Sequence, residues 1–192
     1  MGIHEVFAEH AAVAARAASE LPPVLERIIT ALGECLHRGH KVLACGNGGS
    51  AAQAQHLAAE LVGRFLEERR PLPAIALNAD TVTLTALGND YGYDRVFARQ
   101  VEALATPGDL LFAISTSGNS PNVVLAARTA RGLGCKVIAL TGARGGELAP
   151  LADLSLQAPS TVVARIQEIH ALCVHIMIDS FDARMQTSEP RP

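Results

Sequence analysis

Residues 109–121 read DLLFAISTSGNSP, an apolar run that passes into a loop of hydroxyl residues and ends on a proline. The run DLLFAI has the length and composition of a buried strand. Ser120 followed by Pro121 is the combination expected at the N-cap and the first position of a helix. Together these signals predict the strand, loop and helix order of an α/β fold.

Four other short apolar runs extend this pattern along the chain. Helical or loop segments separate them, as in a mostly parallel sheet that is covered on both faces. We therefore expect a doubly wound, flavodoxin-like α/β fold with a five-stranded parallel sheet. The other four strands are expected in KVLACG (41–46), PAIALN (73–78), KVIALTG (136–142) and LSLQA (154–158).

Helices are predicted at both ends of the chain. Two Ala- and Leu-rich segments, His4 to Glu20 and Pro23 to His37, are separated at Leu21-Pro22-Pro23, where proline ends one helix and begins the next. A last helix is expected from about Val163 to Met185, since no Gly or Pro interrupts it. The expected division is N-terminal helices for oligomerisation at 1–38, one sheet domain at 39–187 and a disordered tail at 188–192.

The apolar character of the two leading helices predicts an assembly. They present more apolar surface than one small sheet can cover, so part of it should be buried between the subunits of a homo-oligomer. The alternative is that both helices simply pack on the sheet of a monomer.

Composition argues against several classes of protein. Sixteen Lys and Arg against 19 Asp and Glu leave a net charge of −3 over 192 residues, with no block of like charge, so direct nucleic-acid binding is not expected. The N-terminal segment carries Glu5, Glu9 and Arg16 at amphipathic spacing, which fits neither a signal peptide nor a membrane span. A cytoplasmic protein without a membrane partner is expected.

Cysteines and lysines argue against two chemistries. The cysteines form no CxxC pair, and because they lie in apolar runs they predict buried free thiols instead of disulfides or a thiolate zinc site. Lys41 and Lys136 are the only lysines, and each opens a predicted strand, opposite the end at which open α/β sheets bind ligands. A Schiff-base lysine is therefore not expected. The four cysteines are Cys35, Cys45, Cys135 and Cys173.

Two loops suit a phosphorylated ligand. In GNGGS, Gly46 to Ser50, the glycines permit close approach of the backbone and Ser50 can cap the next helix, although a tight structural turn would need similar residues. In the second loop, four hydroxyls, free backbone N–H groups and a helix N-terminus converge, as a phosphate requires where no lysine is available. An ordinary capping turn would explain Ser120 but not the other three hydroxyls, those of Ser115, Thr116 and Ser117.

Two helices carry candidate metal ligands. His56 and Glu60, at i and i+4 after the first loop, share a face and can bind one metal ion, although such pairs are often solvated ion pairs. On the last helix, Gln167 and His175 are polar residues in an apolar stretch and need polar partners. About 12 Å of helix separates them, so either their side chains lean together around one metal or they serve different subunits. His170 is a rival ligand that helical spacing turns away from His175.

Six motifs follow one another along nearly the whole chain: GNGGSAA, AQHLAAELVGRF, LTALGNDYGYD, AISTSGNSPN, TGARGGELA and RIQEIHALCVHI. In residues and spacing they resemble those of the phosphoheptose isomerases, in the sugar isomerase (SIS) fold family. The resemblance implies a homotetramer with active sites near subunit interfaces and one zinc per subunit. It also implies conversion of sedoheptulose 7-phosphate to D-glycero-D-manno-heptose 7-phosphate, a precursor of lipopolysaccharide.

Carried over residue by residue, the resemblance assigns roles to most of these polar side chains. It implies that zinc is held by His56, Glu60, Gln167 and His175. Arg64 matches an arginine that similar proteins point into a neighbouring subunit's site. Besides Glu60, Arg64 and Gln167, the implied substrate contacts are Asn47, Gly48, Gly49, Ser50, Asn89, Asp90, Ser115, Thr116, Ser117 and Ser120.

The implied reaction moves a proton between C1 and C2 of a sugar through an enediol, which requires a general base and stabilisation of the developing oxyanion. Glu60 is assigned as the base and His175 as the acid, while zinc would polarise the carbonyl. Because a carboxylate that binds zinc is a weaker base, Glu60 would alternate between the two roles. The chain departs from similar isomerases at Gln53, where they often have Asp, and at Ala164, where some have an acidic residue.

Two other functions compete with the isomerase. One is a non-catalytic tetrameric SIS protein that binds the replication initiator, since LPAIALN, FARQVEAL and ARIQE are about as close to that branch. Proteins of that type typically replace the residues corresponding to Glu60 and His175, and the presence of both favours the enzyme. The other is a phosphosugar sensor, which would use the hydroxyl loop without metal or base.

Overall fold

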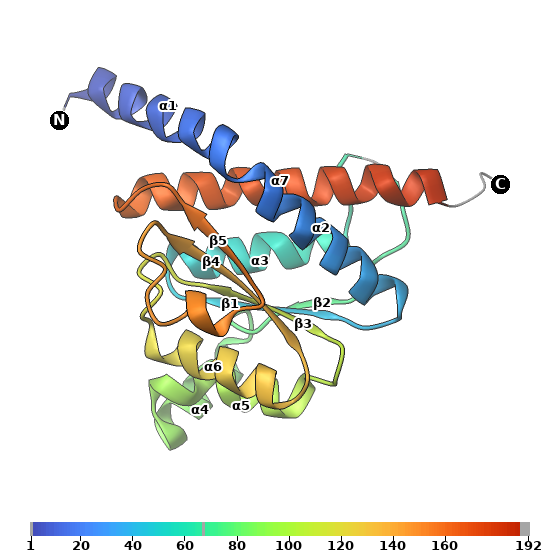
Figure 1. Ribbon diagram of the computed structural model, residues 1–192. Coiled ribbons are helices and arrows are strands. Elements are labelled where there is room, and N and C mark those ends of the chain that lie inside the picture. Colours follow the sequence, from blue (N-terminus) through green and yellow to red (C-terminus); the bar gives the residue numbers. More distant parts are fainter. Residues whose placement is uncertain (1, 67, 189–192) are drawn as a thin grey trace.

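A parallel five-stranded sheet forms the centre of the molecule (Figure 1). The computed structural model describes residues 2–66 and 68–188. Neighbouring strands are parallel in the order β2-β1-β3-β4-β5, which is the flavodoxin-like order expected from the sequence. Each of the five predicted apolar runs contains one strand. The strands are β1 (Val42–Gly46), β2 (Ala74–Ala76), β3 (Leu110–Ile114), β4 (Lys136–Gly142) and β5 (Leu154–Ala158).

Helices cover both faces of this sheet, as its apolar central strands predicted. One layer contains α2 (Pro22–His37), α3 (Gly49–Val62) and α7 (Val163–Ser188). The other contains α4 (Thr81–Tyr91), α5 (Val96–Leu104) and α6 (Pro121–Gly132). Two short 3-10 helices are η1 (Tyr93–Arg95) and η2 (Ala149–Leu151). Alternate residues of β1 point to opposite layers. Val42 and Ala44 pack with α2, α3 and α7, whereas Leu43 and Cys45 pack with α5 and α6. Two apolar clusters therefore hold the three layers together.

The first helix, α1 (Ile3–Glu20), extends away from the sheet (Figure 1). Ala17 is its only buried residue, and Ile3 and Phe7 are 77% and 70% exposed. By contrast, α2 buries one face against the sheet and α7. The excess apolar surface predicted for the leading helices thus lies on α1 and not on both of them.

The ends of the helices follow the sequence signals. Helix α1 ends before Leu21 and α2 begins at Pro22, as the proline pair predicted. The last helix continues past the predicted Met185 to Ser188. Of the disordered tail predicted at 188–192, Ser188 is helical and residues 189–192 lie outside the described part of the chain. Between residues 2 and 188, residue 67 aside, no helix combines the length and apolar character needed to cross a membrane.

The order of the strands brings the two polar loops to one place. Adjacent β1 and β3 are paired along their whole length, and the chain leaves them toward opposite sides of the sheet, to β2 and to β4. Such a reversal opens a crevice at the carboxyl ends of the two strands. The GNGGS loop follows β1 and the STSGNS loop follows β3, so both face this crevice.

Candidate active site

The loop after β3 gathers its hydroxyl groups into one cluster. Ser115 Oγ lies 2.9 Å from Ser120 Oγ and 3.4 Å from Ser117 Oγ. Ser120 is the N-cap of α6 and Pro121 is its first residue, as predicted, but the Ser120 hydroxyl makes no capping bond. An ordinary capping turn therefore does not account for Ser120. The cluster instead lies at the positive end of the α6 dipole.

This hydroxyl loop is held against the loop that follows β4. Gly118 has a φ of 69°, and a Cβ at this position would collide with the Gly145 carbonyl oxygen. The Leu148 N–H donates to the Gly118 carbonyl, and the Glu147 N–H donates to Asn119 Oδ1. Only glycine meets both demands at position 118, and the two loops support each other as one wall of the crevice.

A cavity of about 310 Å³ opens between these two loops and the start of α7. Thr116 and Ser117 of the predicted substrate set line it. Arg144 also lines it and forms no ion pair within the described chain. Arg144 was not identified from the sequence, although its position two residues after the fourth predicted strand was a usable signal. The other polar lining residues that it missed are Asn119, Ser160 and Thr161.

The loop after β1 turns directly into α3. Gly48 is the N-cap, with a φ of 55°, and the helix begins at Gly49. Ser50 is therefore the second residue of the helix and is buried, so the prediction that it caps the helix was wrong. A Cβ at Gly46 would collide with the Ser50 backbone, which explains why this close turn needs glycine.

Asn47 connects this loop to two neighbouring elements. Its side-chain amide exchanges two hydrogen bonds with the amide of buried Asn122, at 2.9 and 3.0 Å. The Tyr93 hydroxyl donates to the same Asn47 oxygen at 3.1 Å. Asn89 and Asp90 are exposed in the last turn of α4, where they bond to each other. Asn122 and Tyr93 were not assigned to the site from the sequence, although they lie within the motifs AISTSGNSPN and LTALGNDYGYD.

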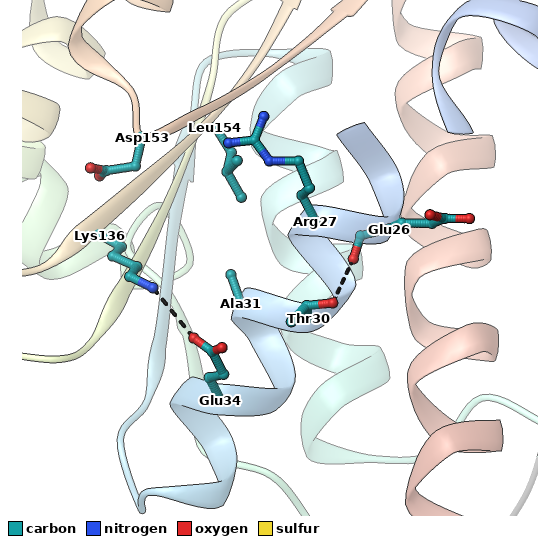
Figure 2. Close-up of a pocket in the computed structure, with 8 residues that line it drawn as sticks. All are labelled: Glu26, Arg27, Thr30, Ala31, Glu34, Lys136, Asp153 and Leu154. Atoms are coloured by element: carbon teal, nitrogen blue, oxygen red, sulfur yellow. Dashed lines mark hydrogen bonds and ion pairs between the residues drawn. The ribbon is translucent and has the colours of Figure 1, made fainter. Parts of the chain in front are cut away.

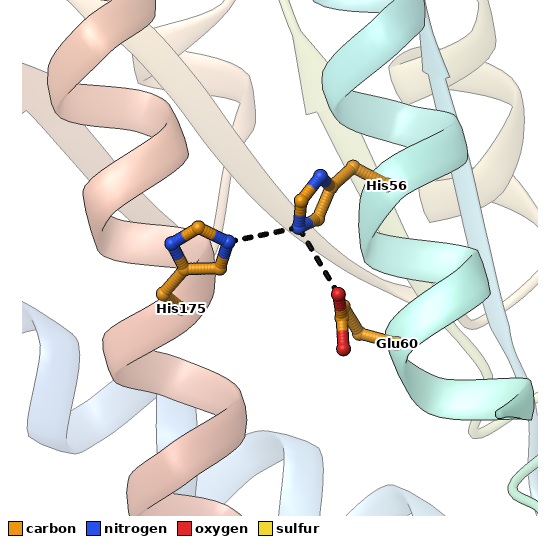
Figure 3. A group of neighbouring side chains, drawn as sticks. All are labelled: His56, Glu60 and His175. Atoms are coloured by element: carbon orange, nitrogen blue, oxygen red, sulfur yellow. Dashed lines mark hydrogen bonds and ion pairs between the residues drawn. The ribbon is translucent and has the colours of Figure 1, made fainter. Parts of the chain in front are cut away.

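Helices α3 and α7 bring three potential metal ligands together (Figure 3). His56 Nε2 lies 3.0 Å from His175 Nε2 and 3.3 Å from Glu60 Oε1. One ligand atom from each residue lies within 4.8 Å of the others. His56 and His175 are 119 positions apart in the sequence, so the packing of α3 on α7 creates this group. Because a second imidazole faces the pair, His56 and Glu60 are more than a solvated ion pair on one helix.

The donor set suits a zinc ion. Two imidazole nitrogens and one carboxylate oxygen are ligands of catalytic zinc sites, which keep a further position open. Facing imidazole nitrogens at 3.0 Å either share a proton or turn both lone pairs toward a cation. The Phe65 ring stacks on His175 with ring centroids 5.3 Å apart, which restricts rotation of that imidazole. Phe65 was not identified from the sequence.

Other predicted residues of these helices lie outside the group of three. Gln167 packs at the start of α3, where a Cβ on Gly49 would collide with its amide. Arg64 is exposed in the segment after α3. His170 is buried and bonds the Thr141 carbonyl at 3.0 Å, and burial lowers its pKa to about 4. His170 is thus a structural residue that points away from His175, as its helical position predicted.

A larger cavity, of about 460 Å³, lies at the amino ends of the strands (Figure 2). Helix α2 and the starts of β4 and β5 line it. Its walls carry charges of both signs, among them Glu34 and Lys136, which pair at 3.4 Å. Its lining residues include no histidine and no cluster of hydroxyls, so it lacks the groups found at the other end of the sheet.

The lysines and cysteines agree with the sequence predictions. Lys41 and Lys136 lie at the amino ends of β1 and β4, away from the crevice. All four cysteines are buried and unpaired. Burial raises the pKa of Cys45 to about 12, so this thiol beside the glycine loop stays protonated near neutral pH.

Known proteins share this architecture over nearly the whole chain. The family model for the SIS domain matches residues 6–142. A phosphoheptose isomerase of Aliarcobacter butzleri is 54% identical over 176 residues, which cover 92% of this chain and 93% of the relative.

Two solved structures are also similar. A phosphoheptose isomerase from Neisseria gonorrhoeae has 45% identity and a TM-score of 0.90 over 94% of this chain and 97% of its own. A phosphoheptose isomerase from Francisella tularensis has 44% identity and a TM-score of 0.91, with coverage of 94% and 96%.

Proposed function

The chain belongs to the SIS domain family and, within it, to the phosphoheptose isomerases, and from this premise we propose that it converts sedoheptulose 7-phosphate to D-glycero-D-manno-heptose 7-phosphate. The names of the relatives support a heptose phosphate as substrate. The observation that carries the proposed chemistry is the meeting of Glu60 and His175, a carboxylate and an imidazole, in one group between α3 and α7. A sensor that only binds a sugar phosphate would not need that pair.

The hydroxyl loop receives the phosphate. Ser115, Ser117 and Ser120 supply hydroxyl donors, and the N-terminus of α6 supplies backbone N–H groups and a partial positive charge. Arg144, which lines a cavity together with Thr116 and Ser117 of this loop, adds a full positive charge that the loop itself lacks. The phosphate end of an open-chain sugar is thereby anchored beside the start of α6.

The sugar chain then lies along the start of α3. Gly48 and Gly49 present backbone without side chains, and Asn47 is held in place by its bonds to Asn122 and Tyr93. Asn89 and Asp90 offer an exposed amide and carboxylate to the sugar hydroxyls. A ligand stretched between these groups and the hydroxyl loop has its reacting carbons at the end remote from the phosphate.

Glu60 and His175 move the protons of the reaction. Glu60 removes the C1 proton of the open-chain ketose and returns it to C2. His175 gives a proton to O2 and takes one from O1, so that a 1,2-enediol lies between ketose and aldose and no atom is gained or lost. His56, 3.3 Å from Glu60 Oε1, orients the carboxylate.

His56, Glu60 and His175 would hold one zinc ion per subunit, with Gln167 as the fourth ligand. Gln167 contacts Gly49, about two helical turns before His56, so its side chain must reach along α3 to join the other three. When bound, zinc would polarise the substrate carbonyl and stabilise negative charge on the enediolate oxygens.

The direct test is incubation of the purified protein with sedoheptulose 7-phosphate, with and without zinc, followed by NMR for the aldose product. Glu60→Gln and His175→Ala are each expected to lower the rate by at least about 100-fold with an unchanged circular dichroism spectrum. Glu26→Gln and His37→Ala remove the same chemical groups from exposed positions on α2 and should keep the parent rate. Full activity in either active-site variant rejects these roles, and phosphosugar binding by the parent without turnover in the presence of zinc indicates the phosphosugar sensor.

The proposed enzyme is a cytoplasmic homotetramer in which Arg64 enters the site of a neighbouring subunit. Exposed apolar side chains on α1 and α7, such as Phe7 and Leu172, support burial of these helices between subunits. Four unpaired cysteines support a reducing compartment. Sedimentation equilibrium measures the mass, and a fully active monomer would contradict both the tetramer and the role of Arg64.

A further inference from the structure

We infer that Arg69 is a positioning residue that holds α3 and α7 in the register needed by the group of His56, Glu60 and His175. Its hydrogen bonds go to none of these three side chains. They join the carboxyl end of one helix to a carboxylate on the other. The link to zinc rests on the proposed function, whereas the geometric role rests on the contacts of Arg69 alone.

Arg69 first caps the end of α3. Its Nη2 donates to the Glu60 carbonyl at 2.6 Å, and its Nη1 donates to the Leu61 and Gly63 carbonyls at 2.9 and 3.2 Å. The last carbonyls of a helix have no partner within the helix and need donors from elsewhere. Because Glu60 itself belongs to this last turn, the guanidinium is bonded to the backbone of the proposed base.

The same guanidinium reaches α7. Arg69 Nε donates to Asp182 Oδ1 at 2.6 Å, and the two side chains are only 10% and 5% exposed. The other Asp182 oxygen is buried and has no hydrogen-bond partner among the described residues. Asp182 lies about two turns beyond His175 on the same helix. One buried contact therefore ties the end of α3 to the part of α7 that follows His175.

Two residues that follow α3, Phe65 and Arg69, complete this connection. Phe65 stacks on the His175 ring, and Arg69 bonds both helices. Only arginine has a planar fork that serves several carbonyls and a carboxylate at once. Without the fork, the last turn of α3 is free to fray and Asp182 is left as a buried charge, so Glu60 shifts relative to His175.

The experiment compares zinc binding with stability in three variants. Arg69→Met combined with Asp182→Leu removes both buried charges, because removal of only one would leave the other uncompensated. Arg69→Lys keeps the charge and loses the fork. Lys41→Met is the matched control, since it removes the cation from another pair with a buried carboxylate, that of Asp109, at the amino end of the sheet.

Both Arg69 variants are expected to bind zinc about 10-fold more weakly than the parent in competition with a chelator, the usual effect of changing groups that support metal ligands. Co²⁺ bound in place of zinc should show an altered visible spectrum in these variants. Lys41→Met should lower the thermal midpoint and keep the parent affinity. Parent affinity in both Arg69 variants, or an equal loss of affinity in Lys41→Met, would overturn the inference.

A readout without metal separates this inference from the proposed function. In the metal-free protein, the imidazole NMR signals of His56 and His175 report on helix packing, since their Nε2 atoms lie 3.0 Å apart. These signals should shift in both Arg69 variants and stay in place in Lys41→Met. A parent protein that binds no zinc would refute the proposed metal site, while unchanged imidazole signals in the Arg69 variants would refute the positioning role.

Discussion

The two ends of the sheet use polar groups in different ways. At the amino end, the buried Asp109 carboxylate accepts hydrogen bonds from the backbone N–H and ammonium groups of Lys41 and from the Thr106 N–H. Burial alone would raise the pKa of Asp109, but these bonds outweigh it and lower the pKa below its usual value. At the carboxyl end, the side-chain hydroxyls of Ser115 and Ser120 have, among the described residues, only hydroxyls of their own loop as partners. The Asp109 carboxylate thus serves the stability of the fold at one end, whereas the hydroxyls of the loop remain available to a ligand at the other.

The larger of the two cavities is not the one that has the groups expected of a ligand site. The cavity at the amino end is the larger, at about 460 Å³ against about 310 Å³, but the Glu34 and Lys136 charges in its wall are paired. The smaller cavity combines Arg144 with four hydroxyls, those of Thr116, Ser117, Ser160 and Thr161, whereas the larger cavity has one hydroxyl, that of Thr30. Available donors that converge on one point are therefore a better guide to the site than volume.

The largest expected effect is on stability at the amino end. Asp109→Ala leaves Lys41 and two backbone N–H groups without their partner, so the free energy of unfolding should fall by about 3 kcal/mol in urea titrations. Turnover per folded molecule should stay at the parent value. Asp153→Ala, which removes one hydrogen bond to the Val137 N–H, should cost less, about 1 kcal/mol. A loss of turnover in folded Asp109→Ala would show that this end is not purely structural.

His170 lies nearer the carboxyl end of the sheet, but its role is structural, because it is buried and bonded to the Thr141 carbonyl. Burial lowers its pKa to about 4, whereas in the unfolded chain it is about 6.5. Above pH 6.5 the residue is neutral in both states. As the pH falls from about 6.5 to about 4, the unfolded chain binds the proton first, so this residue should lower the free energy of unfolding by about 3 kcal/mol over that range.

Urea unfolding of the parent and of His170→Gln across this pH range measures the effect. The difference in unfolding free energy between the parent and His170→Gln should change with pH only between about pH 4 and pH 6.5. The exposed His37→Ala variant should follow the parent curve. Parallel curves for the parent and His170→Gln would contradict the buried, neutral state of His170.

A smaller effect is expected from the hydroxyl loop, and it should appear in binding and not in stability. Ser115→Ala and Ser120→Ala each remove one proposed donor to a charged phosphate, so KM should rise about 10-fold. Unfolding free energies should change by no more than about 1 kcal/mol, because each hydroxyl bonds only to other hydroxyls. Thr129→Val, on the same helix but bonded to the Leu125 carbonyl, should keep the parent KM. An unchanged KM in both serine variants would place the phosphate elsewhere.

The smallest effect should come from the larger cavity. Lys136→Met breaks the pair with Glu34, whose side chains are both about half exposed, so stability should change by less than about 1 kcal/mol. Turnover and KM should equal those of the parent in the same NMR assay. Any change in KM would mean that the cavity at the amino end takes part in function, and the contrast between the two ends would fail.

The sequence alone determined where the sheet and the loops lie. Each strand falls within a predicted apolar run, and the order Ser120-Pro121 marked the start of α6 correctly, because burial of a strand and helix initiation leave local patterns. Local reasoning was less reliable for individual hydroxyls. Ser50 and Ser120 both suit a cap, but Ser50 is buried inside α3 and the Ser120 hydroxyl bonds to Ser115.

Only the tertiary structure decided which polar side chains share a site. Asn47 with Asn122, His56 with His175, and Arg69 with Asp182 are pairs from distant segments, and each member looks like an ordinary polar residue in its own helix or loop. Their distances depend on how α3, α6 and α7 pack over the sheet, which no local pattern encodes. The sequence therefore determined the elements and the chemistry available to them, while packing determined which of those groups meet.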